Sequence, residues 1–165
     1  MATKISGDLR FSASPEQVYA MVTNPEYVQE KNERTGGEEV KVQVDDRGAE
    51  GASIEVSRVL PAEIPSFAKK FVGEQIQTVQ KDEWAPVNSD GSYQGTLNVD
   101  FGKTPMSIKG NFAIRPEGDG AVLEVRGEAK ASVPLVGGKL ENVAVEQFQR
   151  AVRKEQEIGE EWLAR

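Results

Sequence analysis

The hydrophobic period of the chain changes near residue 134, and this change constrains the fold more than any other feature. Between about residues 38 and 133, apolar side chains recur at every second position, as in strands with one buried face. From Leu140 to Leu163 they recur every three or four residues, which predicts one long amphipathic helix. At 1.5 Å per residue this helix is about 36 Å long, enough to cross a whole sheet.

Short connections rich in Gly, Asp and Asn separate the alternating segments, so consecutive strands are expected to pair antiparallel. A further strand is expected at Thr3–Ser12. The segment Gln75–Trp84 is also expected to be a strand, but it carries polar residues at both alternating sets of positions. The pattern therefore leaves open which of its side chains face inward.

Two helix starts follow the first strand. In Ser14-Pro15-Glu16-Gln17 a hydroxyl stands at the N-cap, proline at the first helical position and Gln at the third. Asn24-Pro25-Glu26 repeats the arrangement. We expect two short helices, Pro15–Thr23 and Pro25–Lys31, joined at a sharp corner.

This order of elements predicts an α+β helix-grip fold. A curved antiparallel sheet of about seven strands would wrap on the long C-terminal helix, because no other element is large enough to cover its apolar face. With 165 residues, the chain is expected to form a single domain over residues 1–165.

Composition narrows the function classes. The net charge of −7 argues against nucleic acid as a partner and against anionic membranes, and no apolar run predicts stable membrane insertion. The chain has no Cys and no His, which removes cysteine nucleophiles, the commonest general base and the commonest metal ligand. We predict no catalytic residue, no metal and no cofactor. The N-terminus lacks a secretory h-region, so the expected location is the cytoplasm; the pattern leaves the oligomeric state open.

Two features have alternative interpretations. Ile64, Phe67, Ala68, Phe71 and Val72 have helical spacing, so this segment either seals one end of the core or forms a lid over a binding site. A shallow membrane-touching patch, aided by Lys69 and Lys70, is the third possibility. Arg58 has the parity of Val56 and is expected to point inward. Its guanidinium would either reach water or bind the acidic head of a ligand.

Five stretches carry a resemblance to a known family: Phe11-Ser-Ala-Ser-Pro15, Arg58-Val-Leu-Pro61, Phe71-Val-Gly73, Trp84 and Val133-Pro-Leu-Val-Gly-Gly-Lys-Leu-Glu141. With the order of elements, they resemble the START-like (SRPBCC) superfamily, which includes lipid-transfer domains, pollen allergens and polyketide cyclase-like proteins. The resemblance covers essentially the whole chain and is narrower to a bacterial branch of unknown function. It implies a cavity between sheet and helix that holds an apolar or amphipathic molecule, with the segment after the third strand near the cavity mouth.

We therefore expect the chain to bind a small apolar, lipid-like ligand between sheet and helix. Small inward residues, such as Gly127 and Ala144, either let backbones approach or leave this space free. The alternatives are an interaction domain with a filled core, or a cyclase- or dehydratase-like enzyme using Asp82, Glu83 or Tyr93. The residues expected to face the ligand are Val56, Arg58, Phe67, Phe71, Trp84, Tyr93, Leu97, Val99, Ile108, Phe112, Leu123, Val125, Ala144, Phe148 and Ala151.

Overall fold

The computed structural model describes residues 2–165 and contains one sheet, four α-helices and a short 3₁₀ turn. The elements in chain order are β1 (Thr3–Phe11), α1 (Pro15–Val22), α2 (Pro25–Arg34), β2 (Glu38–Asp46), η1 (Gly48–Glu50), β3 (Ala52–Pro61), α3 (Ser66–Val72), β4 (Gln75–Trp84), β5 (Tyr93–Asp100), β6 (Met106–Glu117), β7 (Gly120–Ala131) and α4 (Gly137–Leu163).

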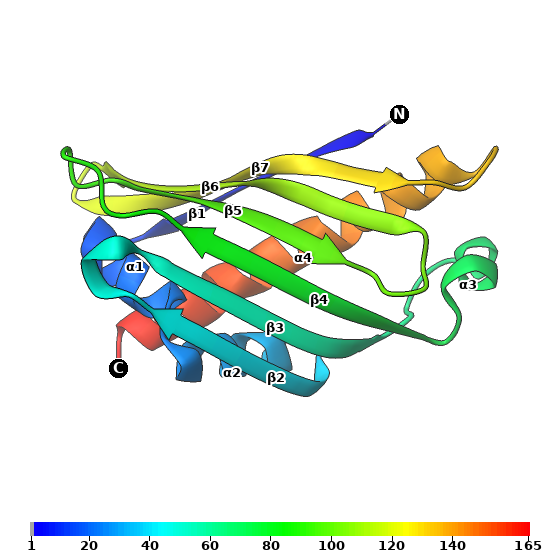
Figure 1. The fold of residues 1–165 in the computed structure, drawn as a ribbon, viewed down its shortest axis with the longest axis horizontal. Coiled ribbons are helices and arrows are strands. Elements are labelled where there is room, and N and C mark those ends of the chain that lie inside the picture. The colour runs from blue at the N-terminus through cyan, green and yellow to red at the C-terminus, as the bar shows by residue number, and fades with distance from the viewer. Residues whose placement is uncertain (1) are drawn as a thin grey trace.

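Seven antiparallel strands form the sheet in the order β1-β7-β6-β5-β4-β3-β2. Strands β1 and β2 are consecutive in sequence but occupy opposite edges, and α1 and α2 connect them. Helix α4 runs along one face of the sheet, with α1 and α2 near its C-terminal end and α3 near the opposite end (Figure 1). The predicted α+β helix-grip fold is confirmed.

The predicted caps begin both short helices. The Ser14 hydroxyl accepts a hydrogen bond from the Gln17 N–H at 3.2 Å, and the Gln17 side chain accepts one from the Ser14 N–H at 2.9 Å. The Asn24 side chain accepts one from the Glu26 N–H at 2.8 Å. These bonds satisfy backbone donors that have no partner inside the helix.

The backbones of β6 and β7 approach each other closely where two glycines meet. Gly110 of β6 pairs with Gly127 of β7, and a Cβ atom at Gly110 would lie 2.5 Å from the carbonyl oxygen of Arg126. A side chain here would push the strands apart. This glycine pair therefore brings backbones together and does not provide room for a ligand.

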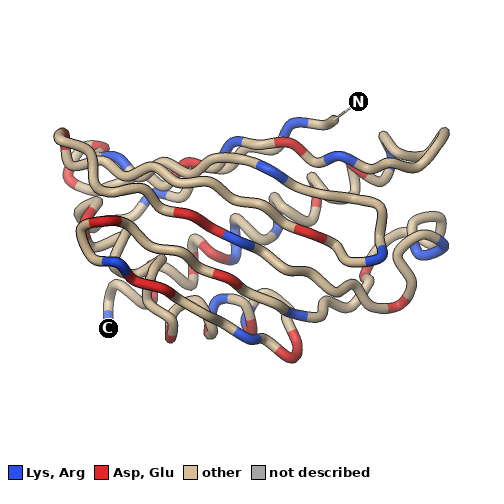
Figure 2. Tube along the Cα trace, in the orientation of Figure 1, with Lys and Arg blue, Asp and Glu red and all other residues tan. Residues whose placement is uncertain are grey.

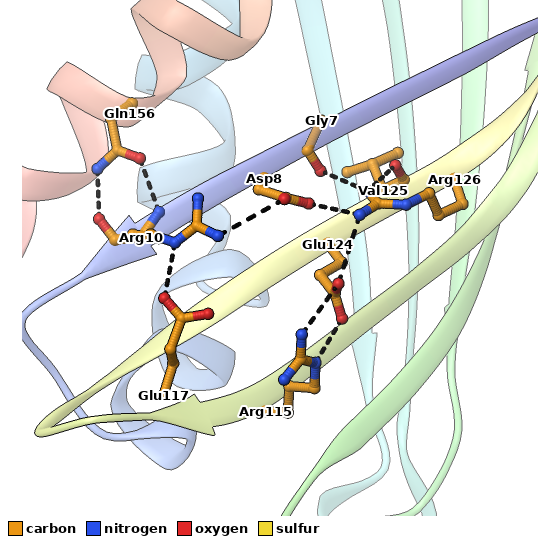
Figure 3. Close-up of polar contacts among 9 residues, drawn as sticks. All are labelled: Gly7, Asp8, Arg10, Arg115, Glu117, Glu124, Val125, Arg126 and Gln156. Carbon is orange, nitrogen blue, oxygen red and sulfur yellow. Dashed lines mark hydrogen bonds and ion pairs between the residues drawn. The ribbon is translucent and has the colours of Figure 1, made fainter.

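On the outer face, charged side chains cover β1, β7 and β6 (Figure 3). Arg10 pairs with Glu117 at 2.6 Å, Arg115 with Glu124 at 2.6 Å, and Arg126 with Asp8 at 2.8 Å. Beneath them, Val122 is fully buried although it faces away from α4. Acidic and basic residues are interspersed along the other strands as well (Figure 2).

Helix α4 is fixed to the sheet at both ends. It begins at Gly137, three residues before the expected Leu140, so Gly137 and Gly138 form its first turn. Near this end the buried carboxylate of Glu141 accepts hydrogen bonds from the Thr3 hydroxyl at 2.7 Å and the Ala131 N–H at 2.9 Å. Near the other end Ile158 is fully buried, and a Cβ atom at Gly159 would lie 2.6 Å from the Phe11 ring.

We expect Glu141→Gln to lower the free energy of unfolding by about 1–3 kcal/mol, because an amide can accept from only one of the two donors without a clash. Burial alone would raise the pKa of Glu141, but the bonds from Ala131 and Thr3 outweigh burial and lower it. The stabilisation by the Glu141 carboxylate is therefore present at neutral pH. It is lost as the pH falls below 4.5, the ordinary pKa of a glutamate. Urea unfolding at pH 7 and pH 4 measures both effects. The exposed Glu146→Gln on the same helix is the control, and equal losses in the two variants would refute this role.

Candidate ligand-binding cavity

A cavity of about 280 Å³ lies between the middle of α4 and the sheet. Helices α1, α2 and α3 and strands β1 and β3 to β7 also contribute to its walls. Twelve of the fifteen residues expected to face a ligand line it, although their role in binding stays a prediction. These are Val56, Arg58, Trp84, Leu97, Val99, Ile108, Phe112, Leu123, Val125, Ala144, Phe148 and Ala151.

Three expected residues lie outside the cavity wall. Tyr93 stacks on Tyr19 of α1, with ring centroids 4.1 Å apart. Phe67 and Phe71 share one face of α3, and Phe71 is 39% exposed. The next face of that helix, with Ala68 and Val72, lines the cavity instead. The sequence predicted that the larger side chains of α3, Phe67 and Phe71, face the cavity. The smaller side chains of Ala68 and Val72 face it instead.

One wall of the cavity is apolar. Strands β5, β6 and β7 contribute aliphatic side chains, and Trp84 stacks on Phe112 with ring centroids 5.2 Å apart. Opposite them, α4 contributes Ala144 and Ala151, whose short side chains leave the space free. The small residues of α4 thus provide room, unlike the glycine pair of the sheet.

The wall formed by β4 is polar. Thr78, Gln80 and Asp82 all face the cavity, whereas Glu83, the residue after Asp82, faces outward, where it contacts Ser53 and Arg47. The strand register determines which side chains of β4 face inward, which the sequence pattern did not. Gln80 pairs with Val56 and Val99, which face inward on the neighbouring strands. Paired residues of neighbouring strands project to the same face.

Asp82 stands between apolar neighbours, since its partners on β3 and β5 are Ile54 and Leu97. The Gln80 amide donates to its Oδ1 at 2.9 Å. Burial raises the pKa of Asp82 to about 6, against the opposing effects of Gln80 and Lys31. Asp82 is thus a cavity carboxyl group that exchanges its proton near neutral pH.

Arg58 is half-buried and lines the same cavity. Its Nη1 donates to the Thr35 hydroxyl at 3.0 Å and to the Asn32 carbonyl at 3.4 Å. Burial lowers its pKa, an effect opposed by Glu155. Lys31 of α2 and Glu155 of α4 also line the cavity, with Nζ and Oε1 4.0 Å apart.

The connection before α3 lies at one end of the cavity. Pro61, Glu63 and Ile64 line it there, and the Gln147 amide of α4 donates to the Glu63 carbonyl at 3.4 Å. This contact joins the connection to α4 across the cavity. The position is compatible with both the seal and the lid that the sequence suggested.

Among residues 2–165, no group of three His, Cys, Asp or Glu side chains is arranged to hold a metal ion. In the same part of the chain, no helix has the length and apolar character required to cross a bilayer.

The family described as "Protein of unknown function (DUF2505)" has a model that matches residues 7–163. No curated protein sequence matches the chain. The expectation of a family of unknown function is confirmed.

Solved structures share the fold at low sequence identity. The protein TTHA0849 from Thermus thermophilus is 18% identical, with a TM-score of 0.64 over 96% of this chain and 95% of that one. Norcoclaurine synthase from Thalictrum flavum, in complex with dopamine and hydroxybenzaldehyde, is 14% identical, with a TM-score of 0.58 over 99% and 88%. Ara h 8.0201 is 8% identical, with a TM-score of 0.55 over 99% of each chain.

We expect Asp82→Asn to increase the free energy of unfolding at pH 7 by about 1–3 kcal/mol, because it removes a charge that burial disfavours. The pKa of Asp82 is raised from 3.8 to about 6, so the native carboxyl holds its proton more tightly than the unfolded one. The advantage of the variant is therefore full above pH 6 and disappears below about pH 4. Urea unfolding from pH 4 to 7.5 measures it, with the outward Glu83→Gln as control. A variant less stable than the wild type at pH 7 would contradict the burial argument.

Proposed function

Since the chain belongs to the DUF2505 family of proteins of unknown function, we propose its function from the cavity itself: it binds a small amphipathic, lipid-like molecule between the sheet and α4. The single observation that carries this proposal is the cavity of about 280 Å³ with one apolar and one polar wall. Ligand sites are commonly mostly apolar with a few polar groups that orient the ligand, and this volume is near the lower end of their range.

The size of the cavity limits the ligand. A space of about 280 Å³ holds about nine groups of the size of water, at about 30 Å³ each. A molecule with about ten non-hydrogen atoms fits this space. Its apolar part would lie against β5 to β7 and the alanines of α4. Its polar part would lie against β4 and the adjacent Arg58 of β3. The complex of norcoclaurine synthase with dopamine and hydroxybenzaldehyde supports a small molecule as occupant, because it shares this fold.

Catalysis is the second candidate function, and Asp82 favours it. A carboxyl group with a pKa of about 6 can take and return a proton near neutral pH. The other two residues considered for this role are not in the cavity wall: Glu83 faces outward and Tyr93 is stacked on Tyr19. Native mass spectrometry of the purified protein, followed by recovery of any bound molecule after prolonged incubation, separates storage of an unchanged ligand from conversion.

We expect Ala151→Phe to fill the cavity and weaken binding of 1-octanol by at least about tenfold, because the new ring occupies the ligand's space. Trp84 lines the cavity and Trp162 does not, so Trp84 fluorescence in a Trp162→Phe background reports binding. The control is Ala20→Phe on the exposed face of α1, and circular dichroism checks that each variant is folded. The proposal would be refuted if Ala151→Phe left octanol binding unchanged. It would also be refuted if the wild type neither bound octanol nor carried a co-purified molecule.

A further inference from the structure

Arg58 is a cation in the cavity wall without an anionic partner. Its only hydrogen-bond acceptors within residues 2–165 are the neutral hydroxyl of Thr35 and the carbonyl of Asn32. No carboxylate of these residues forms an ion pair with it. A half-buried guanidinium is stabilised when an anion binds it, and its planar donors fit the oxygens of a carboxylate, sulfonate or phosphate.

Asp82 is likewise without a cationic partner in ion-pair distance among the described residues, but its situation differs from that of Arg58. A carboxylate can become neutral by taking a proton, whereas a guanidinium keeps its charge in proteins. Asp82 can therefore lose its negative charge by protonation, whereas Arg58 keeps its positive charge. This asymmetry favours a ligand of negative charge over one of positive charge.

The remaining charged groups around Asp82 do not change the preference for a negatively charged ligand. Lys31 from α2 and Glu155 from α4 face it and lie 4.0 Å from each other, so they largely compensate one another. Glu155 also influences Arg58, which lies opposite Thr78, four residues from Asp82 along β4. Next to Asp82, β3 and β5 contribute the uncharged Ile54 and Leu97.

We propose that the ligand is an amphipathic anion whose acidic head lies against Arg58, and that Asp82 takes up a proton when this anion binds. This inference rests on the proposed function, since it requires the cavity to be occupied. The head would replace the missing partner of Arg58. Protonation of Asp82 would then prevent two negative charges from sharing one enclosed space.

The coupling has a definite sign. A bound anion disfavours the ionised form of Asp82 and raises its pKa further. The complex therefore holds more protons than the free protein above about pH 6, where Asp82 of the free protein is ionised. Affinity for a permanently charged anion must then rise as the pH falls, by up to about tenfold per pH unit for one proton taken up.

The head-group experiment uses three probes with the same tail: 1-octanesulfonate, 1-octanol and 1-octylamine. We expect the wild type to bind the sulfonate at least about tenfold more tightly than the amine. Arg58→Met should remove this preference while octanol binding persists. Arg126→Met removes the same charge from the outer face of the sheet and should leave the preference intact. Equal losses in the two variants, or tighter binding of the amine, would overturn the anionic ligand, although octanol binding would still support the cavity as a binding site.

The coupling experiment measures sulfonate affinity from pH 6 to 8, where the sulfonate itself does not titrate. We expect a slope close to one proton in the wild type and none in Asp82→Asn, which should bind the sulfonate more tightly than the wild type at pH 8. Calorimetry in Bis-Tris and Tris, two cationic buffers whose ionisation enthalpies differ, counts the protons directly. The same slope in both proteins would overturn the role of Asp82. Failure of all three probes to bind would instead refute the proposed function.

Discussion

The attachment of α4 at its two ends is the constraint on which the rest of the structure depends. At the N-terminal end, buried Glu141 joins the helix to β1 and to the end of β7. At the C-terminal end, Ile158 and Gly159 are packed against α1 and β1. The stretch between them carries Ala144 and Ala151 and cannot move closer to the sheet without breaking one of these attachments. The cavity is thus a consequence of where the helix is fixed, and of small side chains where it is not.

The polar groups of the cavity do not benefit the stability of the fold. Asp82 is disfavoured in its ionised form, and Arg58 is partly desolvated without an anion. Replacement of either by an apolar residue would relieve a desolvation penalty. Such residues are typical of sites where stability is sacrificed for a specific interaction, and this supports a function for the polar wall.

Sequence patterns predicted the elements and the fold because contrast between apolar and polar positions was strong in most segments. The strand β7 and the helix α4 have clear periods, and the caps at Ser14 and Asn24 have specific side-chain partners. The inward face of β4 could not be predicted, since Thr78, Gln80 and Asp82 are as polar as their neighbours. Only pairing with β3 and β5 determines their direction. In α3, hydrophobicity favoured Phe67 and Phe71, but tertiary packing selected the face with Ala68 and Val72.

Two glutamines of α4 and one of α2 affect whether the sheet edges can pair with strands of other molecules. The Gln156 amide of α4 both accepts from the N–H and donates to the carbonyl of Arg10 in β1 (Figure 3), and Gln149 donates to the carbonyl of Ser6. On the opposite edge of the sheet, Gln29 of α2 donates to the carbonyl of Val40 in β2. Each amide occupies backbone groups that an added strand would otherwise use. The helices thus shield both edges of an open sheet against self-association through strand pairing, the route by which such sheets aggregate.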